Sequence, residues 1–256
     1  MRLLGHPGRT ALPSAPGSIL PVLAATLTAL VTVAPGPATA APGGRGPVVV
    51  QPTQVLAILL TSHTAMSAPD GRSAALQLVD AQRPITGEPT ALPVIGHRFG
   101  AAGTAWLHVR LPGRPNGRTG WIRSRGTIVS TTGWRIVVET SRRRVIVYRN
   151  GRAVRVVKAV VGKPSTPTPH GQFFVEEAVQ LRPTDVGAPF ALALSARSDV
   201  LQEFDGGPGQ IALHGLENVG GVPGTAVSHG CVRLDDGTMR WLVARIGPGV
   251  PVTITN

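Results

Sequence analysis

Glycine and proline interrupt this chain along its whole length. The sequence holds 32 glycines and 24 prolines in 256 residues, about a fifth of the chain. Glycine weakens the interior of a helix or strand, and proline removes a backbone donor from it. Long helices and long central strands are therefore disfavoured over most of the chain. We expect a mainly β fold built from short strands and turns.

The first half of the chain predicts a small β module. Residues 106–111 (WLHVRL) alternate bulky and polar side chains, as a half-buried strand does. A turn signal follows at residues 115–117 (PNG). This spacing indicates a small barrel of roughly 80 residues, which we place at residues 48–128. The flanking residues 41–47 and 129–133 are predicted to be linkers.

The second half, residues 134–256, predicts a further β-rich unit with one short helix. Asn150 and Gly151 suit the positive φ angles of a type I′ hairpin turn between two strands. Near the C-terminus, Asp235 or Asp236 can cap a helix that follows directly. The apolar face of that helix consists of Met239, Leu242, Val243 and Ile246.

Residues 1–40 have the pattern of an export signal. Arg2 and Arg9 supply a positive start, and residues 19–34 are uncharged and mostly apolar. Residues 38–40 (ATA) form a small-x-small cleavage site. The apolar run is short for a membrane-spanning helix, although an uncleaved anchor is the alternative. We therefore expect a secreted protein that acts outside the cytoplasm.

The chain is strongly basic. Its net charge is +12, and because residues 1–40 contain two arginines and no acidic residue, the exported part keeps +10. A basic exported protein is attracted to anionic polymers of the cell wall. Nucleic acid is not expected as a partner of an exported protein. The alternative is that the arginines only solvate the surface.

The single cysteine, Cys231, is the most informative residue of the composition. It has no second cysteine in the chain for a disulfide. In an exported protein, an unpaired thiol is either buried and inert or kept for its chemistry. The neighbours of Cys231 favour chemistry.

Two histidines accompany this thiol in the sequence. Residues 228–234 read SHGCVRL, and His214 ends an apolar run that is typical of a strand. The glycine-rich loop at residues 216–227 can fold back and bring His214 to Cys231. A thiol needs a base of this kind to become a nucleophile. The backbone N–H groups of Gly230 and Cys231 can then stabilise an oxyanion.

This segment resembles the signature of the L,D-transpeptidase catalytic domain, also called the YkuD domain. The Asn-Gly hairpin, residues 161–173 (VGKPSTPTPHGQF), the helix after the cysteine and the ending at residues 249–254 (GVPVTI) are similar to that family as well. The resemblance covers about residues 134–256 and implies a β-sandwich catalytic domain. Residues 106–122 are similar to SH3-like modules that precede such domains in actinobacteria.

The resemblance implies a role for each site residue. Cys231 is the nucleophile, His214 is its general base, and the backbone carbonyl of Gly215 orients the imidazole. His229 supports the thiolate or the bound substrate. The residues implied to shape the oxyanion and substrate site are Ser228, Gly230 and Arg233. Because many members carry asparagine at the last of these positions, Arg233 holds either a stem-peptide carboxylate or the loop.

The activity implied by the resemblance is acyl transfer on peptidoglycan. A stem tetrapeptide forms a thioester with Cys231, D-alanine leaves, and an amine of a second stem accepts the acyl group in a 3-3 cross-link. Carbapenem β-lactams acylate the same cysteine in the family. An L,D-carboxypeptidase and a non-catalytic cell-wall-binding protein are the alternatives. A zinc site at His214, His229 and Cys231 is the less favoured interpretation, so no metal and no cofactor are expected.

Overall fold

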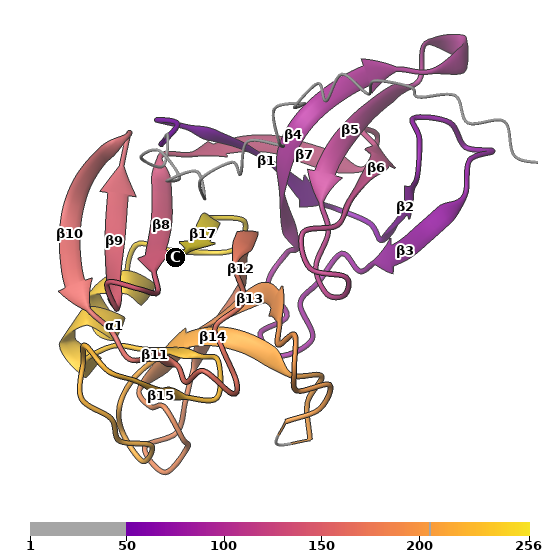
Figure 1. Cartoon of the computed structure of the whole chain (residues 1–256). Coiled ribbons are helices and arrows are strands. Elements are labelled where there is room, and N and C mark those ends of the chain that lie inside the picture. The colour runs from indigo at the N-terminus through magenta and orange to yellow at the C-terminus, as the bar shows by residue number, and fades with distance from the viewer. Residues whose placement is uncertain (1–49, 205) are drawn as a thin grey trace, which may run out of the picture. The chain divides into compact units, whose positions relative to one another are not determined.

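The computed structural model describes residues 50–204 and 206–256 (Figure 1). Within these residues the structure is mainly β with one α-helix, as the sequence predicts, and its strands form three sheets. None of the helices in the described part is long and apolar enough to span a bilayer. The predicted export signal at residues 1–40 and the linker at residues 41–47 lie outside the described residues.

The first sheet has seven strands in the order β3-β2-β6-β5-β4-β1-β7. Its elements are β1 (Gln54–Leu59), β2 (His63–Met66), β3 (Ala75–Val79), β4 (Ala91–Phe99), the 3-10 turn η1 (Ala101–Gly103), β5 (Ala105–Arg110), β6 (Thr119–Arg123) and β7 (Thr127–Thr132). Strand β5 confirms the strand that alternation predicted at residues 106–111. An SH3-like classification of this unit stays a prediction.

The linker predicted at residues 129–133 is wrong for most of its length. Residues 129–132 belong to β7, which pairs antiparallel with β1, so that Leu56 lies opposite Ser130. The segment is rich in β-branched residues, which favour strands when a partner strand is present. Its threonines and serine resembled a loop in the sequence because the partner strand lies more than 70 residues away.

The second sheet has eight strands in the order β10-β9-β8-β17-β12-β13-β14-β16. Its strands are β8 (Trp134–Glu139), β9 (Arg144–Arg149), β10 (Arg152–Lys158), β12 (Gly171–Gln180), β13 (Phe190–Arg197), β14 (Gln210–His214), β16 (Val232–Arg233) and β17 (Pro251–Thr255). Strands β11 (Val161–Gly162) and β15 (Ala226–Ser228) form a separate parallel pair. Asn150 and Gly151 have φ angles of 49° and 78°, which confirms the predicted hairpin turn.

Strand β12 joins two layers of this sheet. Its first half, from Gly171 to Phe174, pairs with β17, and its second half, from Val175 onward, pairs with β13. A register shift between Val175 and Glu177 lies where the partner changes. A strand that changes partners at a bulge lets one sheet turn a corner. The strands on either side of β12 can therefore pack face to face.

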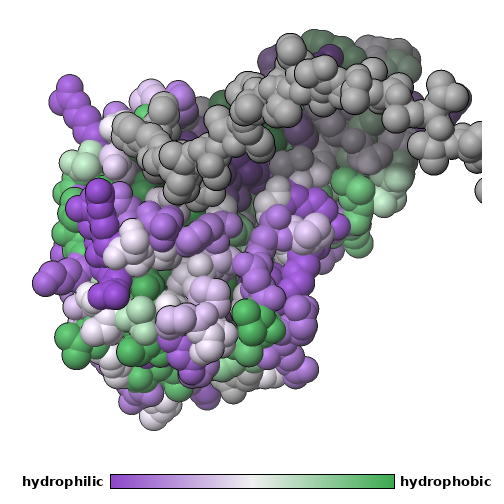
Figure 2. Space-filling view, in the orientation of Figure 1, coloured by the Kyte–Doolittle hydropathy of each residue, from purple (hydrophilic) through white to green (hydrophobic). Residues whose placement is uncertain are grey.

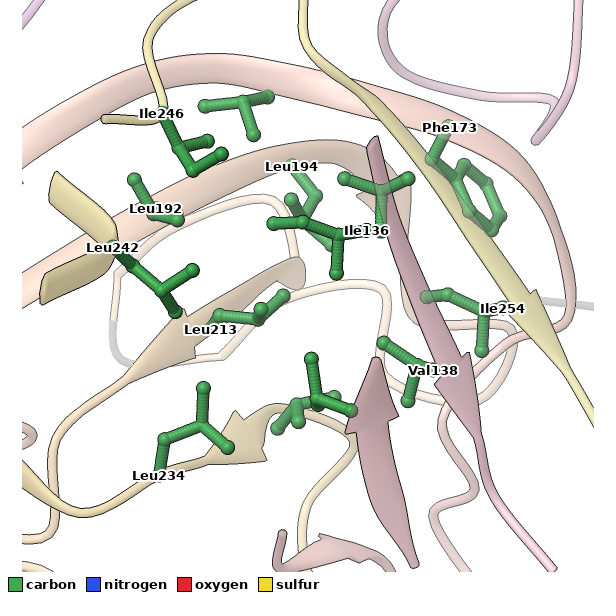
Figure 3. Packing of buried hydrophobic residues seen from close by; sticks show 14 of the residues in the cluster. Ile136, Val138, Phe173, Leu192, Leu194, Leu213, Leu234, Leu242, Ile246 and Ile254 are labelled. Carbon is green, nitrogen blue, oxygen red and sulfur yellow. The ribbon is translucent and has the colours of Figure 1, made fainter. Parts of the chain in front are cut away.

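The core between these layers is apolar and closed. Figure 3 shows Ile136 and Val138 of β8 pointing toward the same interior as Leu213 of β14. The helix α1 (Asp236–Val243) covers this core with Met239 and Leu242, both fully buried. Asp235 caps the helix, as predicted, by accepting a hydrogen bond from the backbone N–H of Thr238 at 2.8 Å.

Two neighbouring phenylalanines on β12 face different cores. Phe173 packs into the core of the second sheet, whereas Phe174 packs into the apolar cluster formed by the first sheet. Both side chains are only 1% exposed. Because successive strand residues point to opposite faces, β12 has one face in each core. The first β unit therefore packs directly against the strand at the centre of the second.

Candidate active site

A short parallel pairing between β14 and β16 brings the predicted nucleophile and base together. Leu213 lies opposite Val232, and His214 lies opposite Arg233. The loop between β14 and β15 folds back, as predicted from its glycines, so that the chain returns to the same sheet edge. Cys231 directly precedes β16, two residues before the partner of His214. Two residues along a strand span about 7 Å, so Cys231 and His214 are offset by about this distance along the strand direction.

Strand alternation places both side chains on one face. Leu213 and Val232 are fully buried in the core, so their neighbours in sequence point away from it. Those neighbours are His214 on β14 and Cys231 beside β16. Both are partly buried. The thiol and the imidazole therefore share the face of the sheet that lies opposite the core.

The ring of His214 has a defined tautomer. Its Nδ1 lies 2.8 Å from the backbone carbonyl oxygen of Gly215, and because a carbonyl only accepts, Nδ1 carries the proton. The other nitrogen, Nε2, then has a free lone pair. Burial lowers the pKa of His214 to about 4, against a partial opposing effect of the Gly215 carbonyl, and Arg233 lowers it further. At neutral pH the ring is therefore an uncharged base.

We expect acid to destabilise the protein through His214. An unfolded histidine takes up its proton near pH 6.5, whereas the folded ring does so only near pH 4. The unfolded state binds more protons in this window, so the free energy of unfolding falls as the pH drops from 6.5 to 4. Between pH 7 and pH 4.5 the loss is about 2 to 3 kcal/mol.

Urea unfolding of the unaltered protein and of His214→Gln at both pH values measures this loss. The variant lacks the titrating ring. Between pH 7 and pH 4.5, the free energy of unfolding of the unaltered protein should therefore fall by about 2 to 3 kcal/mol more than that of the variant. An equal loss in the two proteins would contradict the assignment of a buried neutral ring.

Gly187 packs against this ring, and sequence reasoning missed it. A Cβ built on Gly187 would lie 2.3 Å from Nδ1 of His214, and the residue has a φ of +84°. The backbone N–H of Gly215 donates to the Gly187 carbonyl at 2.8 Å. Only glycine lets the backbone come this close to the imidazole. No signal in the sequence beyond a Gly-Ala-Pro turn pointed to this contact.

We expect Gly187→Ala to displace the His214 ring from the Gly215 carbonyl. A misplacement of about 1 Å in a catalytic group costs about 100-fold in kcat/KM. Gly87→Ala is the matched control, because Gly87 has a similar φ of +69° and no described atom within 4 Å of its built Cβ. Carbapenem acylation rates of both variants give the measurement, and equal rates would show that Gly187 does not position the ring.

The thiol of Cys231 is protonated in this environment. Burial raises the pKa of Cys231, and the backbone N–H of Ala212 and the charge of Arg233 oppose that rise only in part. The Sγ atom lies 4.0 Å from the carbonyl oxygen of Gln210, a weak contact for an S–H donor. Cys231 and His214 are thus both uncharged at rest, and proton transfer accompanies attack on a substrate.

Ser228 shapes the turn before the cysteine, as the resemblance implies. It is fully buried, its Oγ donates to the Cys231 carbonyl at 2.6 Å, and the Gly230 N–H donates to Oγ at 3.1 Å. The Gly230 N–H is therefore occupied in this conformation and is not free for the oxyanion role expected of it. Gly230 has a φ of +122°, which favours glycine at this position.

The loop between β11 and β12 supports this turn from the other side. Thr168 Oγ1 donates to the Gly230 carbonyl at 2.8 Å, and Thr166 Oγ1 donates to the Ser228 carbonyl at 3.2 Å. Both threonines are buried. They belong to the TPTP segment that resembles the family, although the sequence alone did not indicate what their hydroxyls bind.

His229 lies exposed between two side chains that the sequence did not connect to it. Its ring stacks on Phe204 with centroids 5.5 Å apart, and its Nε2 lies 3.5 Å from Nζ of Lys163. Because an ammonium group only donates, Nε2 of His229 is the unprotonated nitrogen in this contact. The supporting role expected of His229 stays a prediction.

Arg233 holds the loop between β14 and β15. Its Nη1 donates to the carbonyl oxygens of Gly220 at 3.1 Å and Val219 at 3.4 Å, and the residue is only 8% exposed. Of its two expected roles, loop holding is the one with contacts in the structure. Its positive charge also lies close enough to lower the pKa values of both Cys231 and His214.

No three His, Cys, Asp or Glu side chains of the described residues are grouped as ligands for a metal ion. The three residues weighed as zinc ligands, His214, His229 and Cys231, form no such group.

Comparison with known proteins gives the same family as the signature. The sequence profile of the YkuD family, described as the L,D-transpeptidase catalytic domain, matches residues 133–254. A Bacillus licheniformis protein, provisionally named L,D-transpeptidase YkuD, is 30% identical over 128 residues. The match covers 49% of this chain and 67% of that protein.

Two mycobacterial proteins are also similar. L,D-transpeptidase 1 of Mycobacterium tuberculosis is 28% identical over 132 residues, and the match covers 47% of this chain and 49% of that protein. A crystal structure of L,D-transpeptidase 3 of the same species, in complex with a faropenem-derived adduct, is 14% identical. That match covers 78% of this chain and 97% of the solved chain. Its TM-score of 0.43 is too low to carry an inference. Through its residues 133–254, the chain belongs to the YkuD family of L,D-transpeptidase catalytic domains.

Proposed function

We propose that this protein is a peptidoglycan L,D-transpeptidase with Cys231 as its nucleophile. The observation that carries the proposal is the β14–β16 pairing, which puts a thiol on the same sheet face as a neutral imidazole with a fixed tautomer. A base with a free Nε2 next to a protonated thiol is what acyl transfer to sulfur requires. Membership of the YkuD family supports the substrate class.

The first half-reaction forms a thioester. Nε2 of His214 takes the proton of Cys231 while Sγ attacks the carbonyl carbon of the third residue of a stem tetrapeptide. The bond between that carbonyl and the terminal D-alanine then breaks, and the protonated His214 gives its proton to the departing amine. The stem tripeptide stays attached to sulfur.

The second half-reaction releases the product. An amine of a second stem attacks the thioester, its proton passes to His214, and the thiol of Cys231 is restored by that proton. The new amide is the 3-3 cross-link. Arg233 lowers the pKa of Cys231, which favours formation of the thiolate, and it lowers the pKa of His214, which favours transfer of the proton from His214 to the departing amine.

The backbone N–H of Cys231 is the donor that we expect to stabilise the oxyanion. The neighbouring Gly230 N–H already donates to Ser228. A single backbone donor in a partly buried site stabilises developing charge more than the same donor in water does. Gly230 contributes by leaving space for the substrate carbonyl, since it has no side chain.

The experiment that tests this function is product analysis with a disaccharide-tetrapeptide. The protein beginning at residue 41 is incubated with the tetrapeptide, and the products are weighed by mass spectrometry. A cross-linked dimer supports the transpeptidase. A tripeptide alone would mean an L,D-carboxypeptidase, and neither product would favour a cell-wall-binding protein.

The proposed location is outside the cytoplasm, on the basis of the signal pattern at residues 1–40. In Figure 2, hydrophilic side chains lie among hydrophobic ones over β9 and β10, a hairpin that carries several arginines and two exposed valines. This basic surface supports contact with anionic wall polymers. N-terminal sequencing of the secreted protein tests cleavage after Ala40, and an intact Met1 would contradict it.

A further inference from the structure

His229 contacts a loop that both β units hold: within the second unit the Ser198 N–H donates to the Gly209 carbonyl at 2.8 Å, and Arg114 of the first unit adds further bonds. The described residues of this loop, 198–204 and 206–209, lie between β13 and β14 and include Phe204, which stacks on His229. Phe204 is 50% exposed, so little of the core fixes its position. Its place against the imidazole depends on how the two ends of the loop are held.

Arg114 of the first β unit binds this loop at three points. Its guanidinium donates to the carbonyl oxygens of Ser198 at 2.8 Å, Leu201 at 2.9 Å and Pro208 at 2.8 Å. These carbonyls belong to both ends of the loop. Gly209 lies close to the same guanidinium, since a Cβ built on it would be 3.2 Å from Nη2 of Arg114. One planar side chain thus joins the outgoing and returning segments.

Asn116, two residues further along the same turn, binds the start of the loop. Its Nδ2 donates to the Arg197 carbonyl at 2.7 Å and to Asp199 Oδ1 at 2.9 Å. Its Oδ1 accepts from the Arg197 N–H at 2.8 Å. Asn116 therefore pairs with the end of β13 much as a neighbouring strand would.

The turn that carries these two residues is fixed against the second unit. The backbone N–H of Gly113 donates to the Ser195 carbonyl at 3.2 Å. Phe174 of β12 is buried in the core of the first unit. Contacts on both sides of the turn leave it little freedom to move relative to β13.

We infer that Arg114 and Asn116 are positioning residues for the active site, which act by holding Phe204 against His229. The inference rests on the proposed function for its kinetic consequence. Phe204 restricts the ring of His229, which lies two residues before Cys231 in the sequence. The first β unit thereby takes part in catalysis from a distance, in addition to any binding of the wall.

The kinetic consequence is a change in substrate binding. Loss of Arg114 removes three hydrogen bonds to the loop and leaves the bond from the Ser198 N–H to the Gly209 carbonyl, so Phe204 leaves His229 for part of the time, while Cys231 and His214 keep their own contacts. We expect Arg114→Ala to raise KM for the tetrapeptide about tenfold and to change kcat by less than about threefold. Arg114→Lys, a single point donor, should restore only part of the effect.

The test compares Arg114→Ala, Phe204→Ala and the double variant in the full chain. If Arg114 acts through Phe204, each single variant removes the same interaction. The double variant should then have the same KM as either single variant. Arg98→Ala, at an exposed position on β4 of the same unit, is the charge-matched control and should leave KM unchanged. Thermal unfolding of each variant shows that the fold is retained.

A second readout does not depend on enzyme activity. The ring current of Phe204 shifts the NMR signal of the His229 ring, which the variant His229→Gln identifies. That shift should be lost in Arg114→Ala and kept in Arg98→Ala. If it is lost as expected in a protein that makes no cross-link, the inference is supported and the proposed function fails.

The inference is overturned if Arg114→Ala keeps both the His229 shift and the KM of the unaltered protein. It is also overturned if the KM effects of Arg114→Ala and Phe204→Ala multiply in the double variant, because the two residues would then act independently.

Discussion

Cys231→Ala is expected to abolish cross-link formation. The nucleophile has no substitute among the described residues near the site, and removal of a catalytic nucleophile costs about 10⁴-fold or more in kcat. The measurement is the amount of cross-linked dimer formed from disaccharide-tetrapeptide at equal protein concentration. Residual activity within tenfold of the unaltered protein would contradict the role of the thiol.

The control for this prediction is the stability of the same variant. Cys231 is only partly buried, and alanine keeps its Cβ. The free energy of unfolding should therefore change by less than about 1 kcal/mol. Binding to isolated cell walls should also be unchanged, since the basic surface is intact. A protein that only binds the wall would show no difference in any of these measurements.

Glu176→Ala is expected to cause the largest loss of stability. This carboxylate is 1% exposed and lies between Arg83 of the first β unit and Arg197 of β13. Oε1 lies 3.0 Å from Arg197 Nη1, and Oε2 accepts from Arg83. Burial raises the pKa of Glu176, and the two guanidinium groups oppose this rise. Without the carboxylate, two nearly buried positive charges remain unpaired, which costs about 3 to 5 kcal/mol.

Glu139→Ala is the matched control for the buried carboxylate. Glu139 also pairs with two arginines, Arg142 and Arg144, but these are 65% and 34% exposed. Its removal should cost less than about 1 kcal/mol. Urea unfolding of both variants gives the comparison. Equal losses would show that the contact between the two β units is not held by a buried charge.

Short-range patterns predicted the parts of the site that lie close in sequence. His214 and Cys231 are joined by one glycine-rich loop, so a strand end and a signature segment were enough to predict that their segments lie beside each other, as the β14–β16 pairing shows. The cap at Asp235 and the hairpin turn at Asn150 follow from local backbone preferences in the same way. These predictions needed no knowledge of a distant partner.

Long-range contacts were not predictable in this way. Gly187 touches His214 from a turn that has no pattern of its own, and Arg114 reaches a loop more than 80 residues away. Nothing in the sequence around Phe204 predicted its contact with His229. The occupied N–H of Gly230 depends on the orientation of one buried serine hydroxyl. Each of these features follows from how the sheets pack, which local sequence does not determine.

The most direct test of the central claim is the intact mass of the protein after treatment with a carbapenem. Family membership and the neutral pair of Cys231 and His214 predict one adduct per chain, located at Cys231 by peptide mapping. Acylation should be at least about 100-fold slower in His214→Gln, because the thiol loses its base. An adduct on another residue, or none at all, would contradict the assignment of Cys231 as the nucleophile.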